Sequence, residues 1–494
     1  MSKVHYTKVF ILVLLVFAGF FRLWRINDLT EFLGDQGRTG MIIYEAWKVR
    51  QLPLVGPPVL TGQFLGPAFY YIIGLPFVFG GFHPIIPSIF MAMLGILAVL
   101  LLYRFASILY GSWIGIAVAG LYAVSPSIVR ADRTLWEPTI VPLFVIFFLY
   151  LAYRAYEKQF PFSLLPLGIV VGILVQLHYP NVIFVGLSLI LILAMALNKR
   201  CRIWPLALGA VGGVIGFFGV LTPFFVYEMS HAWADVREIA FTMLTSGGNG
   251  AATVAPMWEQ MIDYSSRLFG TMIPGVSRNM LIAIQLFAVV ALFWKRSFWS
   301  FFWGVWYVGG IAAISLYKGT VFDHYLHFML PLPFVFMGGV LQALESAIPK
   351  KGLIIISIVL FVWSIHQTDV FTAGPRDISR IGHVVDVIRD ESGATPYSFA
   401  LFASRSFSDL HYRYFFLWRH NEPVIMSDPN YRRLFLVCES EICPGESDMK
   451  EKTRLDIVCF KRFCGGEHPV LDLTGWQLDK TSDVENARIY VYNR

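Results

Sequence analysis

The sequence predicts an α-helical polytopic membrane protein of about eleven spans, followed by a small C-terminal α/β domain. Hydrophobic residues make up 56% of the 494 positions and charged residues only 15%, and the mean hydropathy is +0.61. A soluble domain of this length would need a more polar surface. After about residue 370, charged residues become frequent. We therefore predict a transmembrane domain at 1–370 and a soluble extracytoplasmic domain at 371–494.

The first predicted span covers residues 9–24 and sets the orientation of the chain. Lys3 and Lys8 precede it, and no charge interrupts it before Arg22. Because no small-residue cleavage site follows, the pattern indicates a retained span and not a removed signal peptide. The N-terminus is therefore predicted to be cytoplasmic, in a plasma or inner membrane.

Ten later apolar runs are also predicted to cross, because each approaches the roughly 20 residues that a spanning helix needs. These runs are 85–103, 113–128, 138–156, 162–178, 181–197, 203–226, 277–294, 298–316, 324–345 and 352–370. Basic clusters lie between the runs, at 104, 154–158, 199–202, 295–296 and 350–351, and are predicted to be cytoplasmic. This distribution accounts for the net charge of +6 without a nucleic-acid partner.

One apolar stretch, 66–82, is predicted not to cross. Glycine and proline interrupt it, at Gly66-Pro67 and again at Pro76, which suits a re-entrant or juxtamembrane helix buried against protein. Its exclusion also leaves every basic cluster on the cytoplasmic side. In the alternative topology this stretch spans and a later short run does not.

The segment after residue 370 contains short mixed stretches at 398–402, 435–438, 457–460 and 488–492, which predict strands alternating with helices. Four of the five cysteines lie in it, at Cys438, Cys443, Cys459 and Cys464. In an oxidising compartment an even set predicts two disulfides, with three pairings open. A zinc site is the alternative, although the spacing and the lack of an interleaved histidine favour it less.

The loop after the first span carries the most informative residue, Asp35. A carboxylate at a bilayer surface is costly to desolvate, which favours a functional site. The structural alternative is a helix cap or an ion pair with Arg38. A helix is predicted to follow over 39–50, and Gln63 lies in the turn before the 66–82 stretch.

A second external loop, 129–137, contains two bases, two acids and a tryptophan. Asp132 and Glu137 are the candidate site residues, and Arg130 is a candidate for substrate binding. Alternatively, the two acids pair with Arg130 and Arg133 at a helix end. Trp136 is read first as an interfacial anchor.

Two further segments place polar groups at span ends. Lys318 and His324 lie in 317–327, at an outer span end, where the structural interpretation is a snorkelling lysine and a capping histidine. His178 and Tyr179 form a tight turn whose polar edge should face a cavity. The Gly-rich run 246–253 predicts a flap, or a plain linker.

The order of these features resembles a known family across residues 1–370. The shared features are an acidic residue beyond the first span (Asp35), a Gly-Pro-aromatic helix start at 66–71, a cytoplasmic turn at 103–111, a helix end at 125–130 and His178-Tyr179. The pattern resembles GT-C membrane glycosyltransferases. In particular, it is similar to the family of dolichyl-phosphate-mannose protein mannosyltransferases and of bacterial transferases that move sugars onto lipid A or lipopolysaccharide.

The resemblance implies inverting transfer of a hexose or pentose from a polyprenyl-phosphate donor to a glycan, lipid or protein hydroxyl. It implies Asp35 as the catalytic base, with Asp132 as a second catalytic candidate. Substrate binding is assigned to Arg38, Gln63, Arg130, Glu137, His178, Tyr179, Lys318 and His324. The resemblance implies Lys318 and His324 as the residues that contact the lipid phosphate. Membrane lipid is the remaining partner.

No cofactor is firmly predicted. Some relatives bind a divalent metal with a Glu and a His, but Thr61-Gly62-Gln63 stands where that Glu is expected, which argues against a metal. Two other functions fit a polytopic protein: a transporter or flippase, and a lipid-linked oligosaccharide polymerase or ligase. A transporter usually has ionisable groups near the bilayer midplane and paired broken helices, and the sequence shows neither.

Overall fold

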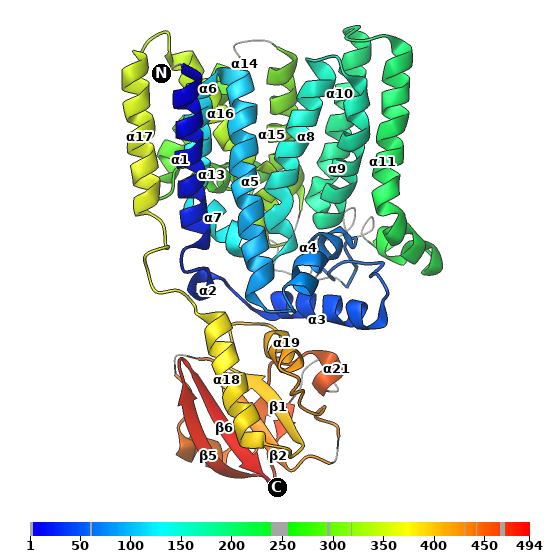
Figure 1. Cartoon of the computed structure of the whole chain (residues 1–494), viewed down its shortest axis with the longest axis vertical. Coiled ribbons are helices and arrows are strands. Elements are labelled where there is room, and N and C mark those ends of the chain that lie inside the picture. The colour runs from blue at the N-terminus through cyan, green and yellow to red at the C-terminus, as the bar shows by residue number, and fades with distance from the viewer. Residues whose placement is uncertain are drawn as a thin grey trace.

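The computed structural model describes residues 3–59, 62–238, 255–293, 297–317, 319–428, 430–440, 442–464 and 470–494. A bundle of helices forms the larger part, and the chain's N-terminus and its C-terminal domain lie at opposite ends of that bundle (Figure 1). The predicted fold class, a helical bundle with a small C-terminal sheet domain, is confirmed.

Each of the predicted spans overlaps a helix of the bundle. These helices are α1 (Lys3–Leu23), α5 (Ile85–Tyr110), α6 (Ser112–Val124), α8 (Val141–Tyr156), α9 (Leu164–Leu177), α10 (Ile183–Leu197), α11 (Ile203–Ser230), α14 (Arg278–Phe293), α15 (Phe298–Leu316), α16 (Pro331–Leu344) and α17 (Lys350–His366). By length and composition, five helices in the described part of the chain suffice to cross a membrane, or seven if two bent pairs each form one span. The number of eleven spans therefore stays a prediction.

The two bent pairs turn the chain sideways near one end of the bundle. α6 meets α7 (Pro126–Arg133) at 62°, and η4 (Asp323–Met329) meets α16 at 49°. Pro126 and Pro331 begin the second helix of each pair. Proline lacks an N–H and clashes with the preceding turn, so a helix bends or restarts there.

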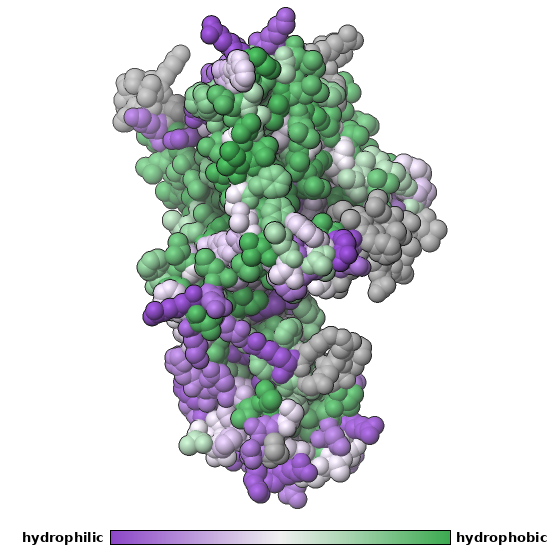
Figure 2. All heavy atoms as spheres, turned by 90° about the vertical axis from the view of Figure 1, so that its right-hand side faces the viewer, coloured by the Kyte–Doolittle hydropathy of each residue, from purple (hydrophilic) through white to green (hydrophobic). Residues whose placement is uncertain are grey.

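The flank of the bundle is apolar where it meets the surroundings. Figure 2 shows hydrophobic atoms over the bundle, while hydrophilic atoms gather on the C-terminal domain and at the opposite end. Large side chains such as Leu193, Val214 and Ile355 are more than half exposed. In a soluble protein this surface would aggregate, whereas in a bilayer it contacts lipid.

Short helices close the end of the bundle that faces the C-terminal domain (Figure 1). They include α2 (Ile26–Leu29), α3 (Gly34–Val49) and α4 (Ala68–Phe79). The chain also forms η1 (Glu137–Ile140), η2 (Pro161–Ser163) between α8 and α9, η3 (Tyr179–Val182) and α13 (Met257–Gly270). The 12 residues of α4 extend about 18 Å, well short of the roughly 30 Å of a hydrocarbon core. Two helices that match predicted spans, α6 with 13 residues and α9 with 14, are only slightly longer. The non-crossing of 66–82 therefore stays a prediction.

The C-terminal domain contains α18 (Asp377–Ser392), β1 (Tyr397–Phe402), α19 (Leu410–Trp418), β2 (Arg433–Cys438), α20 (Glu446–Glu451), β3 (Arg454–Asp456), α21 (Lys461–Cys464), β4 (Val470–Asp472), β5 (Gln477–Val484) and β6 (Ala487–Asn493). Its four-stranded sheet has the order β1-β2-β6-β5, with β1 and β2 parallel and the other pairs antiparallel. β3 and β4 form a separate antiparallel pair.

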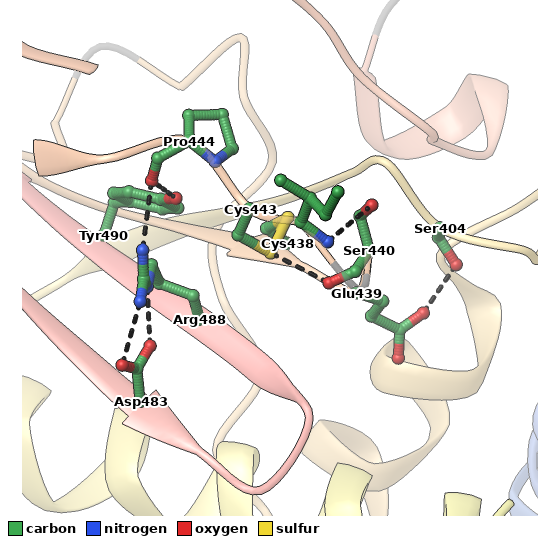
Figure 3. The surroundings of a disulfide bond; sticks show 10 residues. Ser404, Cys438, Glu439, Ser440, Cys443, Pro444, Asp483, Arg488 and Tyr490 are labelled. Carbon is green, nitrogen blue, oxygen red and sulfur yellow. Dashed lines mark hydrogen bonds and ion pairs between the residues drawn. A yellow bond between two sulfur atoms is a disulfide. The ribbon is translucent and has the colours of Figure 1, made fainter. Parts of the chain in front are cut away.

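Both faces of the central strands are buried, which explains their continuous apolar runs. Phe399 and Phe435 point to the face that joins the helical core, whereas Leu434 and Tyr492 point to a second core on the other face. Two disulfides link Cys438 to Cys443 and Cys459 to Cys464, out of the three pairings that the sequence left open. Figure 3 shows the first beside Glu439, at the end of β2.

Candidate active site

Asp35 lies in the first turn of α3, at the end of the bundle nearest the C-terminal domain. The backbone N–H of Leu33 donates to Oε1 of Gln36 at 2.8 Å, and Nε2 of Gln36 donates to the carbonyl of Leu135 at 3.1 Å. These bonds seat the start of the helix against the segment that precedes η1. A helix N-terminus also favours a carboxylate electrostatically.

The Asp35 side chain is 22% exposed and forms an ion pair with Arg38 one turn later. The ion pair that the sequence offered as the structural alternative is therefore present. It uses Oδ1 of Asp35, and part of the side chain remains exposed to solvent. Burial raises the pKa of Asp35 above its ordinary value of 3.8, and the Arg38 guanidinium opposes that rise. A carboxylate with a raised pKa and a partly open surface is a stronger base than an exposed aspartate.

Glu137 and Tyr70 complete a charged cluster around Asp35. Glu137, the first residue of η1, interacts electrostatically with both Asp35 and Arg38. Tyr70, on α4, interacts with all three charges, and its buried hydroxyl has no hydrogen-bond partner among the described residues. Three segments that are distant in sequence thus meet at Asp35.

An aromatic and histidine cluster adjoins this group through Trp136, the neighbour of Glu137. The rings of Trp136 and His324 lie 4.4 Å apart, and those of His178 and His324 lie 5.5 Å apart. Tyr325 packs on His178 at 5.1 Å. The cluster therefore brings together aromatic and imidazole rings from three segments of the chain.

The remaining substrate-binding candidates are distributed around this cluster. The Tyr179 hydroxyl donates to the carbonyl of Phe64 at 2.9 Å, which fixes the loop next to the buried Gln63. Arg130 instead faces away, because it pairs with Asp369 at 2.9 Å and is 61% exposed. Lys318 and the 246–253 run lie outside the described residues.

Asp132 occupies a different environment. Nη2 of Arg22 lies 2.8 Å from its carboxylate, and the residue is 6% exposed. The pairing of Asp132 and Glu137 with Arg130 and Arg133, offered as the structural alternative, is wrong. Arg130 and Arg133 both pair with Asp369 instead, at 2.9 and 3.1 Å. Residues one or two positions apart on a helix, as Arg133 and Arg130 are from Asp132, do not face each other.

Sequence reasoning missed Arg267 on α13, whose guanidinium pairs with Asp323 and donates to the carbonyl of Val321 at 3.2 Å. No local pattern marks Arg267, since it reaches η4 only through the packing of α13. Arg267 therefore places a positive charge beside the 317–327 segment, which is the predicted phosphate-binding segment.

The donor set for a metal was tested on the described residues. Among them, a group of His, Cys, Asp or Glu close enough to share an ion occurs at Asp409, Cys459 and Cys464. Two of those ligands are consumed by a disulfide, which leaves no thiolate. The residues around Asp35 do not form such a group in the described part of the chain.

A cavity of about 400 Å³ lies in the C-terminal domain, and its lining includes Tyr431 and Trp476. It includes none of the predicted site residues. The candidate site is instead the cluster around Asp35, Glu137 and His178.

Comparisons with known proteins agree with this architecture. Residues 65–226 match the family described as dolichyl-phosphate-mannose-protein mannosyltransferase. No curated protein matches the chain. Among solved structures, ArnT from Cupriavidus metallidurans bound to undecaprenyl phosphate is similar at 10% identity and a TM-score of 0.62, covering 99% of this chain and 98% of that one.

The archaeal oligosaccharyltransferase AglB from Archaeoglobus fulgidus, in complex with an inhibitory peptide and a dolichol-phosphate, is similar at 12% identity and a TM-score of 0.53. That match covers 88% of this chain and 69% of that one. The resemblance predicted from the sequence is confirmed at the level of the fold: this chain has the GT-C fold of membrane glycosyltransferases.

Proposed function

We propose that this protein transfers a single sugar from a polyprenyl-phosphate donor to an acceptor hydroxyl, with inversion, at the extracytoplasmic face of the membrane. The observation that carries the proposal is the partly buried Asp35 carboxylate, held where the apolar bundle meets the soluble domain. A base at that level reaches a substrate whose lipid lies in the bilayer and whose sugar lies outside it.

Similar folds support the donor class. ArnT has been solved with undecaprenyl phosphate and AglB with a dolichol-phosphate. The apolar flank of this bundle gives such a lipid a matching environment. Transfer of a single sugar is favoured over transfer of an oligosaccharide because residues 65–226 match a mannosyltransferase family, whereas the match to the oligosaccharyltransferase AglB covers only 69% of that chain.

The proposed step breaks one bond and forms one. The acceptor oxygen attacks the anomeric carbon, the bond from that carbon to the phosphate oxygen breaks, and the phosphate leaves with the electron pair. Asp35 takes the hydroxyl proton. The departing phosphate already holds negative charge and needs no strong general acid. Attack opposite the leaving group inverts the anomeric centre.

Two cations serve the phosphate in this proposal. Arg267 lies beside η4, where it pairs with Asp323, which is 86% exposed, and with Asp263 at 4.0 Å. Lys318 precedes η4 in the sequence. Arg38 instead stays with Asp35. A guanidinium placed near the leaving group stabilises the charge that develops there.

The Trp136, His178 and His324 cluster suits the sugar itself. Aromatic faces pack against the apolar faces of a pyranose, and a neutral imidazole both donates and accepts hydrogen bonds. Our proposal assigns the catalytic base to Asp35 alone, because Asp132 is already occupied by a buried ion pair with Arg22.

The test uses the full-length protein in lipid vesicles with three classes of labelled donor: a polyprenyl-phosphate monosaccharide, a polyprenyl-diphosphate oligosaccharide and a nucleotide sugar. Envelope glycans and lipids serve as acceptors. We expect release of polyprenyl phosphate from the first donor only, with an inverted anomeric proton in the NMR spectrum of the product. Transfer from the diphosphate donor would favour a polymerase or ligase. Movement of intact lipid between leaflets without sugar transfer would favour a flippase.

A further inference from the structure

We propose that the C-terminal domain is a positioning element of the active site, in which Ser406 and α19 hold the first turn of α3 so that Asp35 faces the acceptor. This inference rests on the proposed role of Asp35 as the base. It assigns a catalytic consequence to a domain for which the sequence offered no motif.

The domain binds the main chain on both sides of Leu33, directly before Asp35. The N–H of Phe32 donates to Oδ2 of Asp377 at 3.0 Å, and the N–H of Gly34 donates to Oγ of Ser406 at 3.1 Å. The first N–H groups of a helix have no partner within it. Here one of them is satisfied by a buried side chain from a segment some 370 residues later.

A glycine face on α3 allows α19 to approach very closely. Gly34, Gly37 and Gly40 are spaced by three and lie on one side of the helix. A Cβ at Gly37 would lie 2.3 Å from the carbonyl oxygen of Leu410, and a Cβ at Gly40 would lie 2.4 Å from the ring of Tyr414. Neither distance is tolerable, so any larger residue would push α19 away from α3.

The segment that holds Gly34 is itself anchored in the domain. The N–H of Ser406 donates to Oγ of Ser404 at 3.0 Å, and the Ser404 hydroxyl donates to Oε2 of Glu439 at 2.5 Å (Figure 3). Glu439 also accepts hydrogen bonds from Arg380 at 2.9 Å and Tyr412 at 3.0 Å. These hydrogen bonds hold Ser406 in place through Ser404 and the buried Glu439.

Position matters because a general base acts only within about 2.6–3.2 Å of the proton that it removes. A displacement of about 1 Å costs roughly 100-fold in rate. The C-terminal domain therefore contributes to the rate of transfer through Asp35, and not only through any acceptor that it binds.

Ser406→Ala and Gly37→Ala in the full chain test the proposal. Ser379→Ala is the matched serine control, because Ser379 donates to Glu485 on the exposed side of the domain. Gly186→Ala is the matched helical glycine control, since a Cβ there meets nothing within 4 Å. Transfer is measured per folded protein, with the KM for a polyprenyl-phosphate sugar and the pH profile.

We expect Ser406→Ala and Gly37→Ala to lower kcat by roughly 10-fold or more, with donor KM within about twofold and both controls unchanged. The acidic limb of the profile should move toward the ordinary aspartate pKa of 3.8, because looser packing lets water reach Asp35. The charged or titratable groups that face Asp35, namely Arg38, Glu137 and Tyr70, are intact in all four variants.

An unchanged kcat per folded protein and an unchanged acidic limb in Ser406→Ala would overturn the positioning role, even if Gly37→Ala does not fold. Asp35→Asn separates this failure from that of the proposed function. If Asp35→Asn is inactive while Ser406→Ala is normal, only the positioning role is lost. If Asp35→Asn is active, the assignment of the base itself falls.

Discussion

Asp35 and Asp132 are both carboxylates near the same end of the bundle, and their surroundings give them different roles. Asp132 is bonded to Arg22, whose Nη1 also donates to the carbonyl of Ala123 at 2.8 Å. Breaking such a buried pair leaves an uncompensated charge, so it secures the packing of α1 against α7. Asp35 keeps an open edge, which a base requires.

The raised pKa of Asp35 leads to a prediction for the pH profile. A base acts only when deprotonated, so kcat/KM falls as the pH drops through its pKa. Burial raises that pKa above 3.8 and Arg38 opposes the rise, while Glu137 and Tyr70 also face the group. We expect the midpoint of the acidic limb to lie above pH 3.8 and to move to a higher pH in Arg38→Gln, which removes the charge that opposes the rise. Transfer rates measured from roughly pH 4 to 8 check this, and a limb at or below 3.8 would contradict it.

The sequence singles out Asp35, Glu137 and His178 as candidates, because an ionisable or polar group at a span end stands out against apolar surroundings. It gave no sign of Arg267 or of the Arg22 to Asp132 pair. Those contacts join segments more than 50 residues apart, and a single sequence carries no information on which helices become neighbours.

At the scale of elements, α3 shows where local reasoning fails. The sequence predicted a helix over 39–50, whereas α3 begins at Gly34. Glycine disfavours a helix by roughly 1 kcal/mol relative to alanine, so the Gly-rich start reads as a loop. The packing of α19 against α3 overrides that propensity. The glycines that weaken the helix prediction are the residues that permit this close contact.

The elements of the C-terminal domain are joined by Glu439, and this predicts how the domain responds to acid. Burial acts to raise the pKa of Glu439, but His411, Arg380 and Ser404 outweigh it and lower the pKa to about 2. Because the folded-state pKa lies below the ordinary 4.5, this stabilisation is complete above about pH 4.5 and is lost as the pH falls toward 2.

Hydrogen exchange of β2 and β6 amides in the full-length protein measures that loss. We expect protection to decline between about pH 4.5 and 2, after correction for the intrinsic exchange rate, and the decline to be weaker in Glu439→Gln, which cannot titrate. An equal decline in both proteins would show that Glu439 does not govern the acid stability of the domain.

For the whole molecule, hydropathy and basic clusters predicted the architecture well, because a bilayer leaves few alternatives to a helical bundle. Each predicted span overlaps a helix, and the C-terminal segment forms the predicted mixed domain. The N-terminus and that domain lie at opposite ends of the bundle, so a cytoplasmic N-terminus would place the domain outside. The docking of the domain on α3 was not predictable, since it depends on tertiary contacts.

The central claim is that Asp35 is the base for sugar transfer from a polyprenyl-phosphate donor. The most direct measurement is the single-turnover rate of Asp35→Asn. The control is Asp28→Asn, which alters an aspartate at the same end of the bundle. In the described part of the chain, the Asp28 side chain pairs with Arg25 alone. We expect Asp35→Asn to slow transfer by roughly 100-fold or more while donor affinity changes little, and Asp28→Asn to behave as the unaltered protein. Near-normal turnover of Asp35→Asn with a verified donor and acceptor would contradict the claim.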